Sequence, residues 1–234
     1  MRRRIAVCAA IMLFFLGVVI ISYPFINGER LEKQSEEAVQ SFIETKASEQ
    51  QSSIPYPELY EAMRGYNNTI YVEHQENLDE PWDYTEPSFN LEEYGIEDGV
   101  IAVLNIPAIE LSMPVYLGAS YENMAAGAAH LSQTSLPTGG ENTNCVIAGH
   151  RGWNGADYFK HLDRLNEGDA VQLVTVWDTL DYTVSEIKVI EPYDVEQILI
   201  QEGRELLTLL TCHPYASGGR YRYLVFCERL NESL

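Results

Sequence analysis

Seven short runs rich in aliphatic, β-branched and aromatic residues follow one another from Gly99 onward: GVIAVLNIP (99–107), IELSMPVYL (109–117), TNCVIAGH (143–150), DAVQLVTVW (169–177), LDYTVSEIKVI (180–190), ELLTLLTC (205–212) and YRYLVFCERL (221–230). Residues of these types favour strands. Turn signals separate the runs, among them Thr138-Gly139-Gly140 and Ser217-Gly218-Gly219. Seven or eight short strands with few helices predict a closed or nearly closed β-barrel over residues 99–234.

The amino terminus reads as a membrane segment. Arg2, Arg3 and Arg4 stand before an apolar run over residues 5–26. At about 1.5 Å per residue this run is about 33 Å long, enough to cross the hydrocarbon core of a bilayer. The arginines predict that residues 1–4 stay in the cytoplasm and that the rest lies outside the cell. A cleaved signal peptide starts in the same way, but no A-x-A cleavage pattern follows, which favours an uncleaved anchor in the cell membrane.

Two segments connect this anchor to the predicted barrel. Residues 27–73 carry apolar side chains at helical spacing, interrupted near Pro55 and Pro57, and form a predicted N-terminal helical region. Residues 74–98 are acidic and show little periodicity, so we expect an irregular segment that crosses the surface. A solvated acidic loop and a segment that docks on a cationic site both fit this charge.

The overall charge excludes one class of partner. The chain has 15 Lys and Arg against 35 Asp and Glu, which gives a formal net charge of −20. A nucleic-acid partner is not expected, because neutralising phosphates takes a basic surface. The sequence has no phosphate-cradling glycine motif and no Cys/His pattern with ligand spacing, so we expect neither a cofactor nor a metal.

Cysteines supply the first candidate for chemistry. Cys212 ends the run 205–212, and Pro214 would stop that strand, so the thiol is predicted at a strand end facing a loop. A free thiol kept outside the cell is a candidate nucleophile, although a buried structural cysteine is the usual role of a single thiol. Cys145 and Cys227 lie on predicted strands and are expected to be buried free thiols rather than a disulfide.

Two more residues could act with this thiol. His150 ends the run 143–150, where taken alone it could be an ordinary turn residue. Arg222 alternates with Leu224 and Phe226, so it shares a strand face with two apolar side chains, an unusual place for a solvated arginine. A thiol, a proton shuttle and a fixed cation together suit nucleophilic catalysis.

With these residues the sequence resembles the sortases, the membrane-anchored cysteine transpeptidases of Gram-positive bacteria. TLLTC (208–212) is similar to the family's T-L-x-T-C signature, AGHR (148–151) to the strand with its histidine, and RYLVFCER (222–229) to the strand with its arginine. SLPTGGEN (135–142) and the residues around Cys212 resemble class C, the pilus-polymerising group. The resemblance covers about residues 57–230 and implies an eight-stranded sortase-type β-barrel with short helices, preceded by N-terminal helices and one transmembrane helix.

The resemblance also implies roles for single residues. Cys212 would attack the carbonyl of the Thr-Gly bond in an LPXTG-like sorting signal and form a thioacyl intermediate. His150 would protonate the leaving amine and deprotonate the incoming one. Arg222 would hold the substrate and stabilise the oxyanion, together with the backbone N–H of His213. Thr211 would line the substrate groove.

Class C sortases usually carry a lid with an Asp-Pro-aromatic motif, and the acidic segment contains a similar stretch. Glu80 occupies the aspartate position and Asp79 precedes it. By resemblance, one of these carboxylates would pair with Arg222, and Trp82 would cover Cys212. An ordinary acidic linker with an exposed tryptophan would explain the same residues.

Two further features bear on the subclass. His130 is at a position where the family often has a histidine, and we expect it to support the site from behind or to be purely structural. Many class C members carry a second membrane helix after the catalytic domain. No apolar run follows the last predicted strand here, so a single span is expected.

Several functions remain open at this point. A class C enzyme would join LPXTG-bearing pilins to the amine of a pilin lysine, whereas a housekeeping sortase would attach surface proteins to a cell-wall peptide amine. A membrane-anchored binding module with an unreactive Cys212 and a secreted cysteine hydrolase also fit the sequence.

Overall fold

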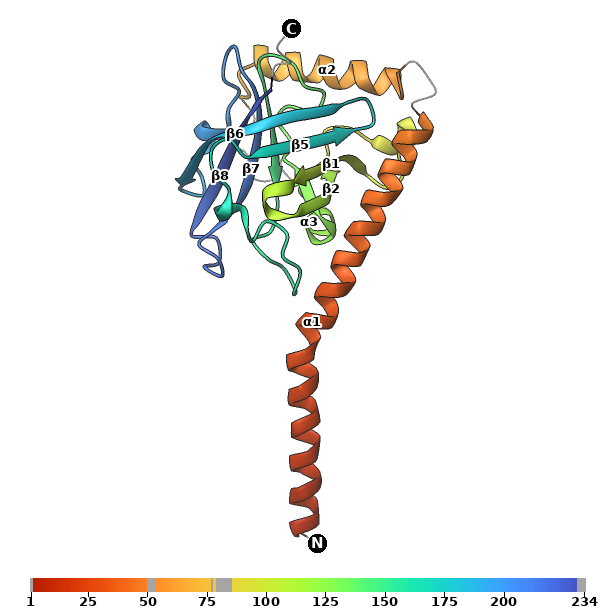
Figure 1. The fold of residues 1–234 in the computed structure, drawn as a ribbon, viewed down its shortest axis with the longest axis vertical. Coiled ribbons are helices and arrows are strands. Elements are labelled where there is room, and N and C mark those ends of the chain that lie inside the picture. The colour runs from red at the N-terminus through yellow and green to blue at the C-terminus, as the bar shows by residue number, and fades with distance from the viewer. Residues whose placement is uncertain (1, 50–53, 77, 79–85, 231–234) are drawn as a thin grey trace.

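The barrel predicted from the sequence is present. A computed structural model of the chain describes residues 2–49, 54–76, 78 and 86–230. Eight strands close in the order β1-β2-β3-β4-β7-β8-β6-β5 (Figure 1). β2/β3 and β4/β7 pair in parallel and the other neighbours are antiparallel. The strands are β1 Val100–Ile106, β2 Leu111–Leu117, β3 Ala128–His130, β4 Thr143–Ala148, β5 Ala170–Thr175, β6 Thr179–Ile190, β7 Glu205–His213 and β8 Tyr221–Arg229.

Few helices accompany the strands. Among the described residues, the α-helices are α1 Arg2–Glu49, α2 Pro57–Val72 and α3 Tyr121–Ala126. The short 3₁₀ helices of the same ranges are η1 Leu91–Tyr94, η2 Pro107–Ile109, η3 Leu162–Arg164 and η4 Val195–Ile198. α2 agrees with the helix predicted after Pro57, and Pro57 itself occupies its first turn, where a missing N–H costs nothing. The short helices lie outside the strands and leave the barrel as the main body of the fold.

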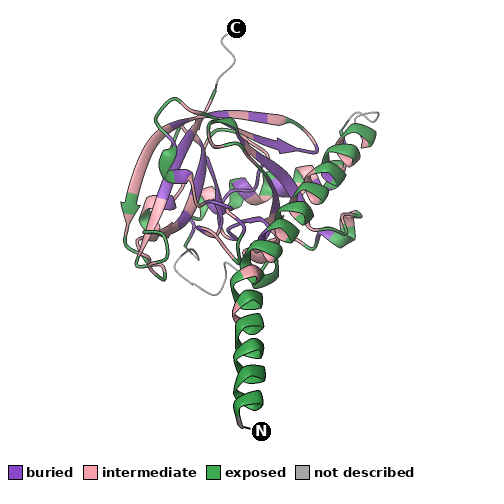
Figure 2. Cartoon of the chain, turned by 60° about the horizontal axis from the view of Figure 1, so that its bottom comes forward, coloured by how far each residue is buried: buried purple, intermediate pink, exposed green. Residues whose placement is uncertain are grey.

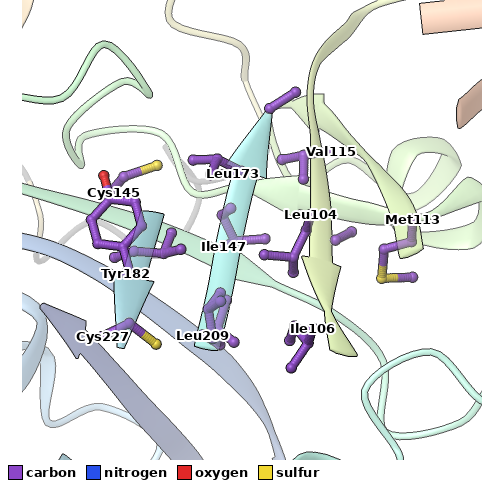
Figure 3. Close-up of a cluster of buried hydrophobic side chains, with 14 of the residues drawn as sticks. Leu104, Ile106, Met113, Val115, Cys145, Ile147, Leu173, Tyr182, Leu209 and Cys227 are labelled. Atoms are coloured by element: carbon purple, nitrogen blue, oxygen red, sulfur yellow. The ribbon is translucent and has the colours of Figure 1, made fainter. Parts of the chain in front are cut away.

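Side-chain alternation explains how the barrel is filled. Leu207 and Leu209 of β7 point into the interior together with Val225 of β8, and all three are fully buried. Figure 3 shows this interior, where Leu104, Ile147 and Leu173 from different strands meet. Because every second side chain of a strand faces one side, the interior takes the odd-numbered residues of β7 and β8.

The even-numbered residues of β4, β7 and β8 lie on the outer face of the barrel, and part of this face is also buried. Leu131, Val146, Ala148, Leu224 and Phe226 form a second apolar cluster, which Ile198 of η4 covers from outside. A sheet buried on both faces reads as a continuous apolar run, which is why VIA in β4 and LLTLL in β7 show no polar alternation. Leu131, Ala148 and Ile198 of this second cluster also line the candidate site described below.

The amino-terminal helix differs from its predicted division. The apolar run 5–26 and the polar stretch after it form one helix, α1, with Pro24 inside it. Figure 1 shows the helix bending near its middle, as expected where a proline interrupts the hydrogen-bond ladder. α1 is the one helix among the described residues that is long and apolar enough to cross a membrane, and Figure 2 shows its amino-terminal part exposed.

The carboxyl-terminal half of α1 lies against the barrel. Phe42 is buried among valines of β1 and β5, including Val100 and Val174. The Lys46 ammonium donates hydrogen bonds to the carbonyl oxygens of Thr175 (2.6 Å) and Asp178 (2.8 Å). The helix therefore packs on the domain as an integral element and is not a free tether.

Candidate active site

Strand register brings the three predicted residues together. Cys212 of β7 and Arg222 of β8 are direct cross-strand partners in the antiparallel ladder. β4 runs parallel to β7 with Ala148 beside Leu210, so the chain two residues further on brings His150 level with Cys212. All three residues follow the even-numbered pattern of their strands, which places them on the outer face of the barrel.

This placement refines the expectation for Arg222. The sequence predicts a face shared with Leu224 and Phe226, and both are indeed fully buried. That face is the outer surface of the barrel and not its interior, because the interior takes Val225 and Cys227. Arg222 itself lies at the open end of the outer cluster, where its side chain is half-buried.

One cavity of about 420 Å³ is lined by the three candidate residues. Its walls are mostly apolar and come from α3, β4, β7 and the segment between β6 and β7. The lining residues outside the candidate set are Ala119, Met124, Leu131, Ala148, Gly149, Ile190, Pro192, Tyr193, Asp194, Val195, Ile198, Leu210 and Thr211. An apolar groove with a few converging polar groups is the usual form of a site that binds a small ligand or a peptide.

The backbone near Gly219 fixes how closely the thiol and the guanidinium approach. A Cβ atom on Gly219 would lie 3.3 Å from Cys212 Sγ and 3.1 Å from Arg222 Nη1, so both groups border the same small space. Gly219 also has φ +82°, a conformation that residues with a side chain rarely adopt. The turn before β8 therefore needs glycine here, and its absent side chain keeps the space between the two groups open.

Backbone carbonyls hold the Arg222 side chain in this position. Nη1 donates to the carbonyl oxygens of Gly219 (2.8 Å) and Tyr221 (3.3 Å). Within the described part of the chain the guanidinium has no ion pair with a carboxylate. It is thus a fixed cation at the cavity, with donors left for an incoming anionic or carbonyl oxygen.

The His150 imidazole is oriented by packing. It stacks on the Trp153 indole with ring centroids 4.5 Å apart and planes 16° apart, and Tyr158 meets it edge-on at 6.4 Å. Burial lowers the pKa of His150 below its ordinary value. At neutral pH the ring is therefore mainly neutral and able to accept a proton.

Thr211 and Leu210, which directly precede Cys212 in β7, are hydrogen-bonded to Gly149 in the loop that carries His150. The Thr211 hydroxyl donates to the Gly149 carbonyl oxygen (2.7 Å), and the Gly149 amide donates to the Leu210 carbonyl oxygen (3.0 Å). Thr211 is 1% exposed, so it forms part of the cavity wall mainly by holding Gly149 and His150 alongside the thiol strand.

A further residue, Arg151, was not singled out from the sequence. Its guanidinium is buried, and Nη1 lies 2.8 Å from His213 Nδ1 and 3.5 Å from the Cys212 carbonyl oxygen, while Nη2 pairs with Asp163 at 2.7 Å. Arg151 follows His150 and His213 follows Cys212, so this contact joins the backbones next to both candidate residues. Arg151 is the last residue of the AGHR motif (148–151), but its role could not be read without the tertiary contact with His213.

This contact also defines the state of His213. An arginine can only donate, so His213 Nδ1 is the accepting nitrogen and its ring is held as the Nε2–H tautomer. The ring stacks on Tyr223 with centroids 5.5 Å apart. His213 does not line the cavity, and its imidazole packs against Arg151 and Tyr223 instead.

The remaining predicted residues fall into two groups. His130 is fully buried, with Nε2 bonded to the Ser135 carbonyl oxygen (3.0 Å), and burial lowers its pKa to about 4. It pairs with Ile147, an interior residue, and so lies on the opposite face from His150. Asp79, Glu80 and Trp82 lie outside the described residues, and the lid stays a prediction.

The other thiols are placed as expected. Cys145 and Cys227 are free and buried, and Figure 3 draws both beside Tyr182 in the barrel interior. Burial strongly raises the pKa of each thiol, which keeps them protonated and unreactive. Cys212, by contrast, is partly exposed at the cavity. Across the described ranges, no group of three His, Cys, Asp or Glu side chains could hold a metal ion.

The site therefore combines a nucleophile, a neutral imidazole and a fixed cation over an apolar groove. This combination suits acyl transfer through a covalent thioester, because the thiol can attack a carbonyl, the imidazole can move a proton and the cation can stabilise the oxyanion. The comparison with known proteins agrees with this chemistry.

A family model described as the sortase domain matches residues 104–230. Sortase D of Bacillus subtilis is 27% identical over 130 residues, which cover 55% of this chain and 63%, less than two thirds, of that protein. The solved structure of Streptococcus pneumoniae sortase C is 33% identical with a TM-score of 0.70, over 85% of this chain and 98% of that one. Sortase C1 of GBS pilus island 1 is 30% identical with a TM-score of 0.72, over 85% and 93% of the two chains. The chain belongs to the sortase family of cysteine transpeptidases.

Proposed function

We propose that this sortase cleaves an LPXTG-like sorting signal between Thr and Gly and joins the new carboxyl end to the amine of a pilin lysine. The observation that carries the proposal is the meeting of Cys212, His150 and Arg222 at one groove. The likeness to a sortase C whose structure was described for its pilin substrate specificity, and to one from a pilus island, supports the polymerising subclass.

The reaction proceeds in two steps at this groove. His150 takes the proton of the Cys212 thiol, Cys212 Sγ attacks the threonine carbonyl carbon, and Arg222 stabilises the oxyanion that forms. The C–N bond breaks, His150 gives a proton to the leaving glycine amine, and a thioester remains on Cys212. The lysine amine then attacks the thioester and His150 takes its proton. The C–S bond breaks, and His150 returns this proton to the departing Cys212 sulfur, which gives an isopeptide bond and the free thiol.

Anchoring completes the proposal. The apolar part of α1 spans the membrane once, with Arg2–Arg4 on the cytoplasmic side and the barrel outside. On this proposal the chain consists of a cytoplasmic segment 1–4, a membrane anchor 5–26, a helical region 27–73, an acidic lid-like segment 74–98 and a catalytic barrel 99–234. α1 also joins the second and third segments physically, since it continues to Glu49 without a break.

The test uses the full chain in detergent micelles with an LPXTG-type peptide, and the intact mass is recorded. An acyl adduct that disappears in Cys212→Ala is expected. Adding a lysine-bearing pilin peptide should convert the adduct to a linked product. A product only with a cell-wall peptide amine would assign the enzyme to surface-protein anchoring, and release by water alone would make it a hydrolase. No adduct and no alkylation of Cys212 would leave a binding module.

The lid is tested separately, because its residues lie outside the described structure. In a Cys8→Ala background, which removes the exposed thiol of α1, Trp82→Ala should raise the rate at which a thiol reagent labels Cys212. Equal labelling rates with and without this substitution would discard the lid. Cys145 and Cys227 serve as internal controls, because their burial should keep them unlabelled in the folded protein.

A further inference from the structure

The loop after His150 touches α1 at the end of its apolar run. A Cβ atom on Gly155 would lie 1.8 Å from the Pro24 carbonyl oxygen, and one on Gly28 would lie 2.6 Å from the Gly155 carbonyl carbon and oxygen. Asn27 Nδ2 donates to the Asn154 carbonyl oxygen (3.1 Å). The two backbones therefore meet at a pair of glycines. In Figure 1 the loop that follows β4 reaches the middle of α1.

Aromatic side chains surround this contact. Tyr121, at the start of α3, is 69% exposed and meets Trp153 edge-on with ring centroids 6.1 Å apart. Trp153 in turn stacks on His150. Tyr23 of α1, one residue before the contact, is 60% exposed. Tyr23, Tyr121 and Trp153 thus lie near the end of the apolar run, measured along the axis of α1. Trp153 also packs on the imidazole of His150.

We propose that residues 152–156 and Tyr121 form a membrane-contacting surface, which seats the catalytic end of the barrel in the lipid headgroup layer. The glycine contact between α1 and this loop sets the depth. The proposal rests on the membrane anchoring of α1 stated above. The occupant of the surface is the headgroup region of the bilayer that α1 itself crosses.

The dimensions of a bilayer support this depth. The hydrocarbon core is about 30 Å thick and the whole bilayer about 40–45 Å, which leaves a headgroup layer of about 5–8 Å on each side. Residues 24–28 of a helix span about 6 Å, and the apolar run ends inside this interval. A loop in contact with residues 24–28 therefore lies at the headgroup layer. Trp and Tyr are the side chains most favoured there, because an apolar ring and a polar tip meet both environments.

The packing of α1 excludes a barrel that moves freely away from the membrane. Contacts continue from Asn27 at the loop to Lys46, which is bonded to the carbonyls of Thr175 and Asp178. Lys46 lies about 28 Å further along the helix axis than Asn27, at 1.5 Å per residue. The helix therefore fixes both the height and the tilt of the barrel, with the His150 loop at the membrane and Trp177, which follows Thr175 by two residues, at the far end.

This arrangement offers a matched pair of fluorescent reporters. A variant that keeps only Trp153 (Trp82→Phe, Trp177→Phe) reports on the proposed surface. A variant that keeps only Trp177 (Trp82→Phe, Trp153→Phe) reports on the distal end, where the indole donates to the Pro55 carbonyl oxygen. Both full-length proteins are reconstituted into phosphatidylcholine vesicles that carry a nitroxide quencher on the headgroup, and vesicle flotation measures insertion.

The expected result is strong quenching of Trp153 and none of Trp177. Trp153 left unquenched in protein that floats with the vesicles would overturn the proposal, and so would equal quenching of both reporters. Protein that does not float would refute the anchoring of α1 and this surface with it. The peptide-adduct test above is independent of either result, so a failure of the chemistry and a failure of the surface are distinguishable.

A second pair of variants tests whether the glycine contact sets the depth. Gly28→Leu places a side chain against Gly155, whereas Gly17→Leu adds the same side chain in α1 at a position with nothing within 4 Å. In the Trp153-only protein, Gly28→Leu should reduce quenching and Gly17→Leu should leave it unchanged. Equal quenching in both variants would show that the contact does not hold the loop at the membrane.

Discussion

Replacing Thr211 by valine should damage the active site through a single hydrogen bond. The Thr211 hydroxyl donates to the Gly149 carbonyl oxygen at 2.7 Å, and Gly149 directly precedes His150. Valine keeps the branched shape but has no donor. The substitution therefore removes the bond that holds the His150 loop level with Cys212, while the side chain stays β-branched.

The magnitude follows from burial. Thr211 is 1% exposed and Gly149 is buried, so the carbonyl loses its donor away from bulk water. Leaving a buried acceptor unsatisfied costs about 1–3 kcal/mol. In a protein of this size each kcal/mol lowers the Tm by about 2–4 °C. If the same restraint is used in the transition state, kcat/KM falls between about fivefold and about 150-fold, since about 1.4 kcal/mol is a factor of ten.

Thr208→Val is the matched control. Thr208 is on the same strand, is fully buried, and donates a hydrogen bond of the same length, 2.7 Å, to Asn144 Oδ1, away from the cavity. Both variants are measured by thermal unfolding and by transpeptidation rates well below the Tm. The expected outcome is a similar loss of stability in both and a loss of kcat/KM only in Thr211→Val. Equal losses of kcat/KM would refute the positioning role, and so would wild-type activity in Thr211→Val.

Three other outcomes are expected. Arg151→Met removes the donor to His213 and should lower kcat/KM by about tenfold to 150-fold, because a charge-assisted hydrogen bond contributes about 1.5–3 kcal/mol. His130 has a pKa of about 4 in the folded protein, below its ordinary value, so between these two values the unfolded chain binds more protons than the folded one. This histidine should therefore lower the free energy of unfolding by about 2 kcal/mol from pH 7 to pH 5. The His130→Gln variant should lack this contribution to the pH dependence. Trp153→Ala should expose His150, raise its lowered pKa and move the acid limb of the rate profile to higher pH.

Each of these has its own control. Arg151→Lys should not restore activity, because an ammonium lacks the planar fork that reaches both partners, and full activity in the lysine variant would contradict that account. Urea unfolding at the two pH values measures the histidine contribution, and an identical pH dependence in wild type and His130→Gln would rule it out. Trp153→Phe keeps a stacked ring and should leave the acid limb in place; a shift equal to that of alanine would mean that stacking does not govern the imidazole.

Much of this architecture could be predicted from local pattern. Short apolar runs separated by turn residues predicted the barrel, and the motifs around Cys212, His150 and Arg222 predicted the family. The third strand, Ala128–His130, is the exception, because three residues are too few to show a period. The outer apolar cluster was also hidden, since a continuous run such as LLTLL reveals burial on both faces but not which residue faces which side.

The helix α1 shows a similar division. Its apolar stretch and its triple arginine were readable, because membrane crossing depends on length and composition. The polar stretch up to Glu49 was also predicted to be helical, but not that it continues the same helix. The contact with the His150 loop was not readable, because it joins residues more than a hundred positions apart. Glycines at 28 and 155 look ordinary in the sequence and gain meaning only where the two backbones meet.

The sequence alone identified the reactive groups proposed for this protein, Cys212, His150 and Arg222, because a thiol, an imidazole and a guanidinium have intrinsic properties that do not depend on the fold. Their cooperation was not local. The Cys212–Arg222 register, the alignment of β4 with β7 and the buried link from Arg151 to His213 arise only when the barrel closes. Closure brings together strands that are distant in the chain, and only this contact excludes water, shifts the pKa of His150 and fixes the geometry that the reaction needs.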